Sequence, residues 1–190
     1  MYVTPRFVFL HLPKTGGTFV ERALQRLEPG RGRTLANRVA RKLGLCVTVE
    51  LPQHGTYRDT PVAVRGRPML TVLRNPLDQY VSEFHFDRHH DHPEQFGGSN
   101  PVIRARWPRF PDLSFDEFVR YMNTERTTMK FPGLPPEQQP GLFSQIFIQF
   151  VALNPNQLAR DLTPELVRSG AIHRYLCPEL HVLFTHQLND

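Results

Sequence analysis

The chain has 190 residues, the size of one ordinary domain, and 39% of them are hydrophobic. Only 22% are charged, which excludes the low-hydrophobicity, high-charge profile of a disordered protein. The net charge of +5 favours anionic ligands but does not decide between nucleic acid, nucleotide and acidic polymer.

No apolar run reaches the ~18 residues that a membrane span needs, and the N-terminal apolar stretch is too short for a signal peptide. We therefore expect a cytoplasmic protein with no transmembrane segment. Its two cysteines, Cys46 and Cys177, are too few for a disulfide framework and lack the spacing of a zinc site. We expect two buried thiols.

The first predicted unit is a strand, a glycine turn and a helix. Residues 6–12 form a nearly continuous apolar run between prolines, as in a strand buried on both faces of a parallel sheet. Residues 14–18 read KTGGT and predict a turn, and the apolar spacing over residues 19–27 predicts a helix packed on one face.

A second helix over residues 31–42 and a strand over residues 46–51 are expected next, followed by a second buried strand over residues 69–73. Asn75 and Pro76 then give a strong start signal for a helix that should run to about residue 89.

The second half of the chain alternates irregular stretches with helices. Residues 90–111 and 124–141 are rich in proline and glycine, so we expect loops in both. Between them, Ser114 and Glu117 form the pattern of a capping box that opens a short helix. Three elements complete the prediction, which are helices over residues 142–153 and 163–175 and a strand over residues 180–185.

Alternating strands and helices predict an α/β fold, with one domain over residues 1–190 and a mostly parallel central sheet flanked by helices. Ligands of such sheets bind at the carboxyl ends of the strands. Because residues 13–19 and 74–82 each follow a predicted strand, we expect them to converge on one site.

The turn after the first strand has the chemistry of an oxyanion loop, a P-loop-like strand–loop–helix phosphate site. Its glycines let backbone N–H groups converge on an anion at the positive end of a helix, Lys14 adds a charge, and the hydroxyls of Thr15 and Thr18 can add hydrogen bonds. A plain strand-to-helix turn is the alternative. The motif is not a Walker A loop, because the lysine precedes the glycines.

A second anion site is suggested by Arg74, which ends a buried strand, and by Ser82, eight residues later on the next helix. An arginine fork and a hydroxyl could hold a phosphate there. The ordinary alternative is a surface arginine.

Together these stretches resemble the sulfotransferases that use 3′-phosphoadenosine 5′-phosphosulfate (PAPS), especially bacterial and glycan-modifying members related to heparan sulfate 2-O-sulfotransferases. Residues 9–18 (FLHLPKTGGT) resemble the family's 5′-phosphosulfate loop, and residues 71–82 (TVLRNPLDQYVS) resemble its 3′-phosphate motif. The resemblance implies that the 3′-phosphate is held by Arg74 and Ser82, and the 5′ end by Lys14, Thr15, Gly16, Gly17 and Thr18. It also leaves open whether this chain lacks C-terminal elements of its relatives.

Residues 52–57 (PQHGTY) resemble the family segment whose histidine is the usual candidate for the catalytic base. The resemblance thus implies that His54 is the base, and a histidine titrates near working pH. An exposed loop histidine is the alternative interpretation. His11 is the second candidate, and further candidates are Glu50, Glu83 and His85.

Two more groups of residues are candidates for a metal site and for a substrate-binding site. His85 and His89 have the i, i+4 spacing that could share a metal, but a solvated helix end is the favoured interpretation and no metal site is predicted. The second group joins an aromatic ring to three positive charges and is expected to bind the acceptor of the sulfuryl group. Its residues are Arg104, Arg106, Trp107 and Arg109. No nucleic-acid module accompanies them.

The leading hypothesis is a PAPS-dependent sulfotransferase that moves a sulfuryl group to an acceptor hydroxyl on a carbohydrate, with Lys14 and His54 as catalytic residues. Adenosine 3′,5′-bisphosphate would be the product, and no metal is required. The alternatives are a noncatalytic binder of nucleotides or polyanions and a small-molecule kinase.

Overall fold

The computed structural model describes residues 1–4, 6–27, 53–125 and 130–186. The helix predicted over residues 31–42 and the strand predicted over residues 46–51, with Cys46 and Glu50, lie outside these residues. The chain is divided into two compact units. The sheet unit comprises residues 1–73 and 177–190, and the helical unit comprises residues 74–176. That residues 1–190 act as one domain stays a prediction.

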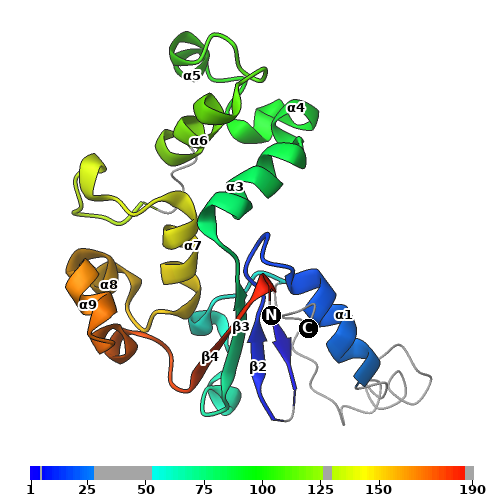
Figure 1. The fold of residues 1–190 in the computed structure, drawn as a ribbon, viewed down its shortest axis with the longest axis vertical. Coiled ribbons are helices and arrows are strands. Elements are labelled where there is room, and N and C mark those ends of the chain that lie inside the picture. The colour runs from blue at the N-terminus through cyan, green and yellow to red at the C-terminus, as the bar shows by residue number, and fades with distance from the viewer. Residues whose placement is uncertain (5, 28–52, 126–129, 187–190) are drawn as a thin grey trace. The chain divides into compact units, whose positions relative to one another are not determined.

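The fold class is α/β, and the described part of the sheet unit contains a mixed four-stranded sheet (Figure 1). Its strands lie in the order β1 (Tyr2–Val3), β2 (Val8–Leu10), β3 (Met69–Leu73) and β4 (Leu180–Phe184). β1 is antiparallel to β2, whereas β2, β3 and β4 are parallel. The predicted mostly parallel sheet is confirmed. The sequence analysis missed β1, because a two-residue strand leaves no periodic pattern.

The two strands predicted to be buried form the centre of this sheet. All three residues of β2 are fully buried, and β2 pairs with β3 in a register that sets Val8 opposite Met69. β4 pairs with β3 up to Leu73 and Phe184, but it lies last in the strand order and its side chains are largely exposed. The carboxyl ends of β2 and β3 therefore lie side by side.

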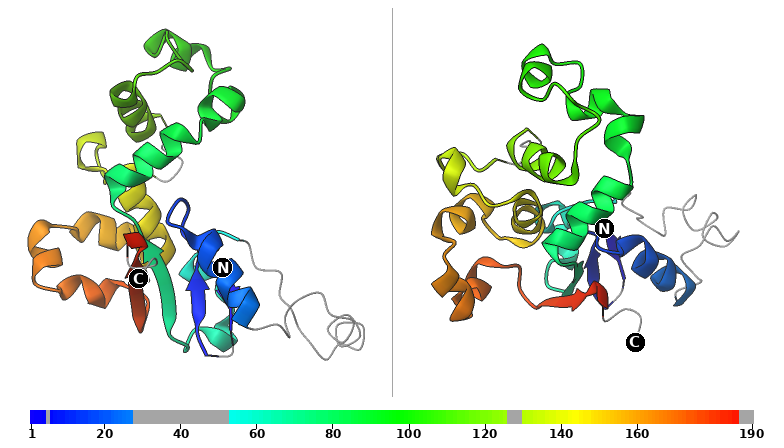
Figure 2. Two further views of the ribbon diagram at one scale, coloured as in Figure 1. Left: turned by 45° about the vertical axis from the view of Figure 1, so that its right-hand side comes forward. Right: turned by 45° about the horizontal axis from the view of Figure 1, so that its top comes forward.

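One helix of the sheet unit, α1 (Gly17–Leu27), follows β2 directly and begins two residues before its predicted start. Its Val20 and Leu24 pack with Phe9 of β2 and Val72 of β3. This apolar contact holds α1 alongside the sheet (Figure 2), with its N-terminus next to the end of β2. Two short 3₁₀ turns, Tyr57–Asp59 and Val62–Val64, precede β3.

The helical unit is built from α3 (Pro76–His85), α4 (Arg88–Asp91), α5 (Pro101–Arg106), α6 (Phe115–Thr124), α7 (Leu142–Val151), α8 (Pro155–Asp161) and α9 (Pro164–Arg168). Asn123 joins three of these helices, since its Oδ1 accepts hydrogen bonds from the Tyr80 hydroxyl at 2.6 Å and from the Leu142 N–H at 2.9 Å. Burial raises the pKa of Tyr80, so this hydroxyl keeps its proton and remains a donor.

The starts of α3 and α6 were predicted from their capping residues and are confirmed. Asn75 accepts a hydrogen bond from the Leu77 N–H, and Ser114 and Glu117 form the expected capping box. The same signal stands at Asn100-Pro101 and Asn154-Pro155, where the side chains cap α5 and α8. Neither α5 nor α8 was predicted, although their start signals are as clear as that of α3.

Two predicted helix ends and one predicted loop are wrong. The helix expected to reach residue 89 ends at His85, because Asp87 takes a left-handed conformation with φ 58° and separates α3 from α4. Residues 90–111 are not irregular, since they contain α5 and a 3₁₀ turn at Pro93–Phe96. The helix expected over residues 163–175 breaks at Gly170, with φ 73°, into α9 and the 3₁₀ segment Ala171–Tyr175.

The stretch predicted to be a loop at residues 124–141 contains one 3₁₀ turn, Pro136–Gln138, in its described part. The Gln139 side chain holds this loop, because it accepts from the Phe131 N–H and donates to the Phe131 and Leu134 carbonyls. Cys177 is buried as predicted, and burial raises the pKa of its thiol to about 12. Across the described residues, no helix combines the length and the apolar character that crossing a membrane requires.

Candidate functional site

The loop between β2 and α1 has a backbone that few sequences could adopt. Gly16 has φ 83°, and its carbonyl accepts hydrogen bonds from the N–H groups of Phe19 at 2.9 Å and Val20 at 3.3 Å, which starts α1. Lys14 has φ 61°, in the left-handed region that costs a lysine about 1–2 kcal/mol. Strain of this kind is common at ligand-binding loops.

The N-terminus of α1 carries unused hydrogen-bond donors. Gly16 and Thr18 are exposed residues, and none of the backbone hydrogen bonds with good geometry in the described part of the chain uses their N–H groups. They lie at the positive end of the helix dipole, where an anion is stabilised by both the dipole and the N–H groups. The loop geometry is therefore suited to an oxyanion.

The threonines of the loop differ in what they offer. Thr15 is fully buried, and its hydroxyl donates to the Leu12 carbonyl at 3.0 Å. Its hydroxyl proton is thus used inside the loop and is not offered to a ligand. The Thr18 side chain is exposed at the start of α1.

The buried His11 ring packs against the loop and fixes its position. Its ring is buried, its Nδ1 lies 3.2 Å from Glu21 Oε2, and its opposite edge faces the backbone of Gly17. A Cβ atom at Gly17 would lie 2.1 Å from His11 Cδ2. Glycine is required at position 17 by this contact.

His54 lies beside His11, at the same end of the sheet. The two rings meet edge to face with centroids 4.9 Å apart, and His54 Nδ1 lies 3.0 Å from the His11 carbonyl oxygen. A carbonyl only accepts hydrogen bonds, so Nδ1 carries the proton and neutral His54 has its lone pair on Nε2. Its side chain is exposed, whereas that of His11 is buried. Of the two histidines, His54 is the one that can reach a substrate.

One side chain ties the loop to the end of β3. The Thr185 hydroxyl lies 3.1 Å from the Thr15 carbonyl oxygen and 3.0 Å from the Leu73 carbonyl oxygen. The end of β3 is thereby held next to the loop. Arg74 is covalently joined to Leu73 but, with Ser82 on α3, belongs to the helical unit. That residues 13–19 and 74–82 converge stays a prediction.

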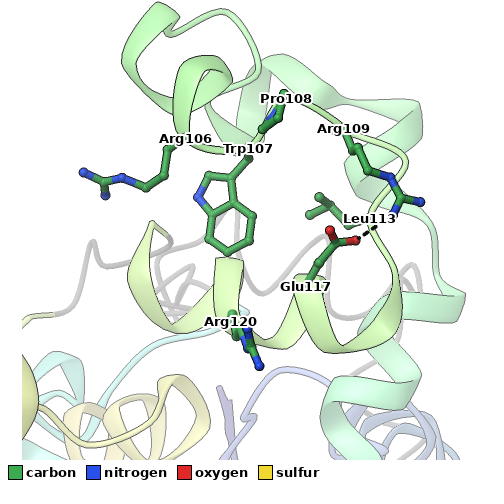
Figure 3. Close-up of a pocket in the computed structure, with 7 residues that line it drawn as sticks. All are labelled: Arg106, Trp107, Pro108, Arg109, Leu113, Glu117 and Arg120. Atoms are coloured by element: carbon green, nitrogen blue, oxygen red, sulfur yellow. Dashed lines mark ion pairs between the residues drawn. The ribbon is translucent and has the colours of Figure 1, made fainter.

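Three of the four residues predicted to bind the acceptor line one pocket of the helical unit. The pocket has a volume of about 250 Å³ and is lined by Arg106, Trp107, Pro108, Arg109, Leu113, Glu117 and Arg120 (Figure 3). Arg104 is exposed on α5 and is not part of the lining. The sequence analysis did not find Glu117 or Arg120, because α6 brings them to the pocket from a separate element.

The charges of this pocket are largely paired. Glu125 Oε1 accepts from Arg106 Nη1 at 2.9 Å and from the Trp107 indole N–H at 3.0 Å. Arg109 lies 3.4 Å from Glu117, on the other side of the indole (Figure 3). The indole is therefore held in a fixed orientation, and the pocket is less cationic than its arginines alone suggest.

Comparisons of the chain with protein-family models, with curated proteins and with solved structures found no match.

Gly17→Ala should destabilise the chain by about 1–3 kcal/mol, because the added methyl group would overlap the buried His11 ring. Gly66→Ala is the matched control in the same unit, since a Cβ there would have no atom within 4 Å. Chemical denaturation of both variants measures the effect. Equal stability of the two variants would contradict the packing of His11 against Gly17.

The stability of the sheet unit should fall at acidic pH through His11. Burial, with a smaller contribution from His54, lowers the pKa of His11 below its ordinary 6.5, although Glu21 opposes the shift. The unfolded chain therefore binds the proton first, so this stabilisation is complete above pH 6.5 and is lost as the pH falls below 6.5 and through the folded pKa.

Denaturation of the wild type and of His11→Gln at about pH 7.5 and about pH 5.5 tests this linkage. The free energy of unfolding should fall more steeply with acidification in the wild type than in the variant. The same pH dependence in both proteins would show that His11 is not responsible.

Proposed function

We propose that the protein is a sulfotransferase that transfers the sulfuryl group of PAPS to a hydroxyl of a carbohydrate acceptor. The observation that carries the proposal is the pair of exposed residues Gly16 and Thr18 at the start of α1, shortly after Lys14, whose N–H groups take part in none of the well-formed backbone hydrogen bonds of the described residues. If these groups form a P-loop-like phosphate site, it would suit a phosphosulfate, and the sequence around it resembles the phosphosulfate loop of PAPS-dependent enzymes.

Two groups of residues would hold the cofactor. The N–H groups of residues 15–18 and the Lys14 ammonium would bind the 5′-phosphosulfate. Arg74 and Ser82 would bind the 3′-phosphate, which is the group that distinguishes PAPS from ATP. The position of Arg74 in the chain supports this role, because it follows Leu73, whose carbonyl shares the Thr185 hydroxyl with the loop.

In the proposed reaction the acceptor oxygen attacks the sulfur atom, and the bond between sulfur and the bridging phosphate oxygen breaks. The acceptor proton passes to His54 Nε2, which has a lone pair because Nδ1 donates to the His11 carbonyl. The electron pair of the broken bond remains on the 5′-phosphate, where Lys14 stabilises the added charge. The products are the sulfated acceptor and adenosine 3′,5′-bisphosphate.

The pocket around Trp107 is the proposed acceptor site. A flat indole face suits stacking against a sugar ring, and paired arginines can exchange a protein carboxylate for an acidic group of the acceptor. The pocket volume of about 250 Å³ is just below the ~300–1,000 Å³ that is usual for small-molecule sites, which suits a ligand group about the size of one sugar unit. The proposed substrate class is therefore an acidic oligosaccharide.

Lys14→Met should lower the rate of sulfuryl transfer by about 10²- to 10³-fold, the range seen when one preorganised charge-stabilising donor is removed. Methionine keeps the length of the side chain and removes its charge. The measurement is the transfer of radiolabelled sulfate from PAPS to a uronic-acid oligosaccharide.

Lys130→Met, which changes an exposed lysine of the helical unit, is the control and should transfer sulfate at the wild-type rate. Wild-type turnover in Lys14→Met would exclude Lys14 from the chemistry. Absence of transfer by the wild-type protein to any member of a panel of acidic and neutral oligosaccharides would contradict the proposed function.

Trp107→Ala should raise the KM for a uronic-acid oligosaccharide by about tenfold, equivalent to about 1.4 kcal/mol, and leave the affinity for adenosine 3′,5′-bisphosphate unchanged. Added salt should also raise this KM, because it screens the arginine–carboxylate contacts. Phe86→Ala, at an exposed aromatic ring of the same unit, is the control. Loss of bisphosphate affinity in Trp107→Ala, or a KM independent of salt, would move the acceptor site elsewhere.

A further inference from the structure

A cluster of histidine and aspartate side chains lies at α4, in the helical unit and outside the proposed sulfotransferase site. Asp87, His89 and His90 each offer one ligand atom, and these atoms all lie within 4.8 Å of one another. Their order in the sequence hides this arrangement. The i, i+4 pair His85 and His89 suggests a shared helix face, but the turn at Asp87 places these residues on different helices.

His89 is the unusual member of the cluster. Its side chain is 1% exposed, and neither ring nitrogen has a hydrogen-bond partner. The ring packs against Phe84, Phe96 and Phe118, with centroid separations of 5.7, 6.3 and 4.8 Å. A buried imidazole is almost always hydrogen-bonded or bound to a metal, so its lone pair calls for a ligand.

The Asp87 carboxylate is the polar group nearest to the His89 ring that the structure records. His89 Nε2 lies 3.9 Å from Asp87 Oδ1, and the same oxygen contacts His90 Nδ1. Two ligands bound to one tetrahedral ion at about 2.1 Å lie roughly 3.4 Å apart. The three ligand atoms could therefore surround an ion after shifts of about an ångström in the exposed side chains of Asp87 and His90.

The second nitrogen of His90 is also arranged as in a metal site. His90 Nε2 lies 3.3 Å from Asp112 Oδ1. A histidine that binds a metal through one nitrogen commonly donates its other N–H to a carboxylate, which fixes the tautomer. When a cation takes the place of the Nδ1 proton, which otherwise bonds to Asp87, His90 can keep its other proton on Nε2 and donate it to Asp112.

We propose that Asp87, His89 and His90 bind a divalent cation of the zinc class, with Asp112 orienting His90. Two imidazoles and one carboxylate match Zn²⁺, Co²⁺ or Ni²⁺ better than Ca²⁺ or Mg²⁺, which prefer oxygen ligands. Water would take the remaining position, because Asp87 is exposed and His90 is partly exposed. The three ligands lie on α4 or directly before it, and the contact of His90 with Asp112 links the site to the segment before α6.

Zinc binding to the tag-free full-length chain tests the proposal, measured by competition with a chromophoric chelator and by thermal unfolding with added Zn²⁺. We expect one tight equivalent and a raised unfolding temperature. Two ligand variants should each weaken binding at least tenfold. They are His89→Phe, which suits the aromatic surroundings, and Asp87→Asn, which tolerates the left-handed backbone. Asp112→Asn should weaken it by about 10- to 100-fold.

His85→Gln is the matched control, because it removes an exposed histidine of the same unit from the end of α3. Its zinc affinity should equal that of the wild type. Asp87→Asn gives an independent result if His89→Phe fails to fold. The proposal is overturned if the wild type does not bind Zn²⁺, if Asp87→Asn and a folded His89→Phe bind it as tightly as the wild type, or if only His85→Gln loses binding. The cluster would then be an ion pair between His90 and its two carboxylates.

Discussion

Backbone carbonyl groups at the carboxyl ends of parallel strands need hydrogen-bond donors once the strand ladder stops, and in this protein side chains supply them. The Thr15 hydroxyl serves Leu12, the His54 ring serves His11, and the Thr185 hydroxyl serves Leu73. An unpaired buried carbonyl costs about 1–3 kcal/mol, so these contacts are strong constraints on the loop. They bring residues that are distant in sequence to the start of α1.

The same constraint determines which groups remain for chemistry. Because the Thr15 hydroxyl and the His11 ring are held within the protein, the loop offers backbone N–H groups, Lys14 and the exposed Thr18 hydroxyl rather than the hydroxyl of Thr15. Because His54 donates through Nδ1, its exposed Nε2 is the nitrogen that can accept a proton. In the helical unit, Glu125 plays a comparable role by holding Trp107 and Arg106 at one oxygen.

The sequence predicted the central strands and the start of α3 because these depend on local signals, namely apolar runs between prolines and an Asn-Pro pair. It did not predict the left-handed turn at Asp87, because glycine is the usual signal for a left-handed residue and position 87 is an aspartate. Nor could it find the contact between His11 and Gly17 or the pairing of Arg106 with Glu125, which are 6 and 19 residues apart and depend on how elements pack. The motif residues of the loop could be selected from the sequence, but the use of the Thr15 hydroxyl inside the loop could not.

Calorimetric titration of the wild-type protein tests the central claim most directly, with adenosine 3′,5′-bisphosphate in the absence of metal compared with ATP in the presence of Mg²⁺. A loop that binds a phosphosulfate, together with an arginine for a 3′-phosphate, predicts tighter binding of the bisphosphate. Equal or tighter binding of ATP with Mg²⁺, or no binding of the bisphosphate, would contradict the assignment of the loop to PAPS.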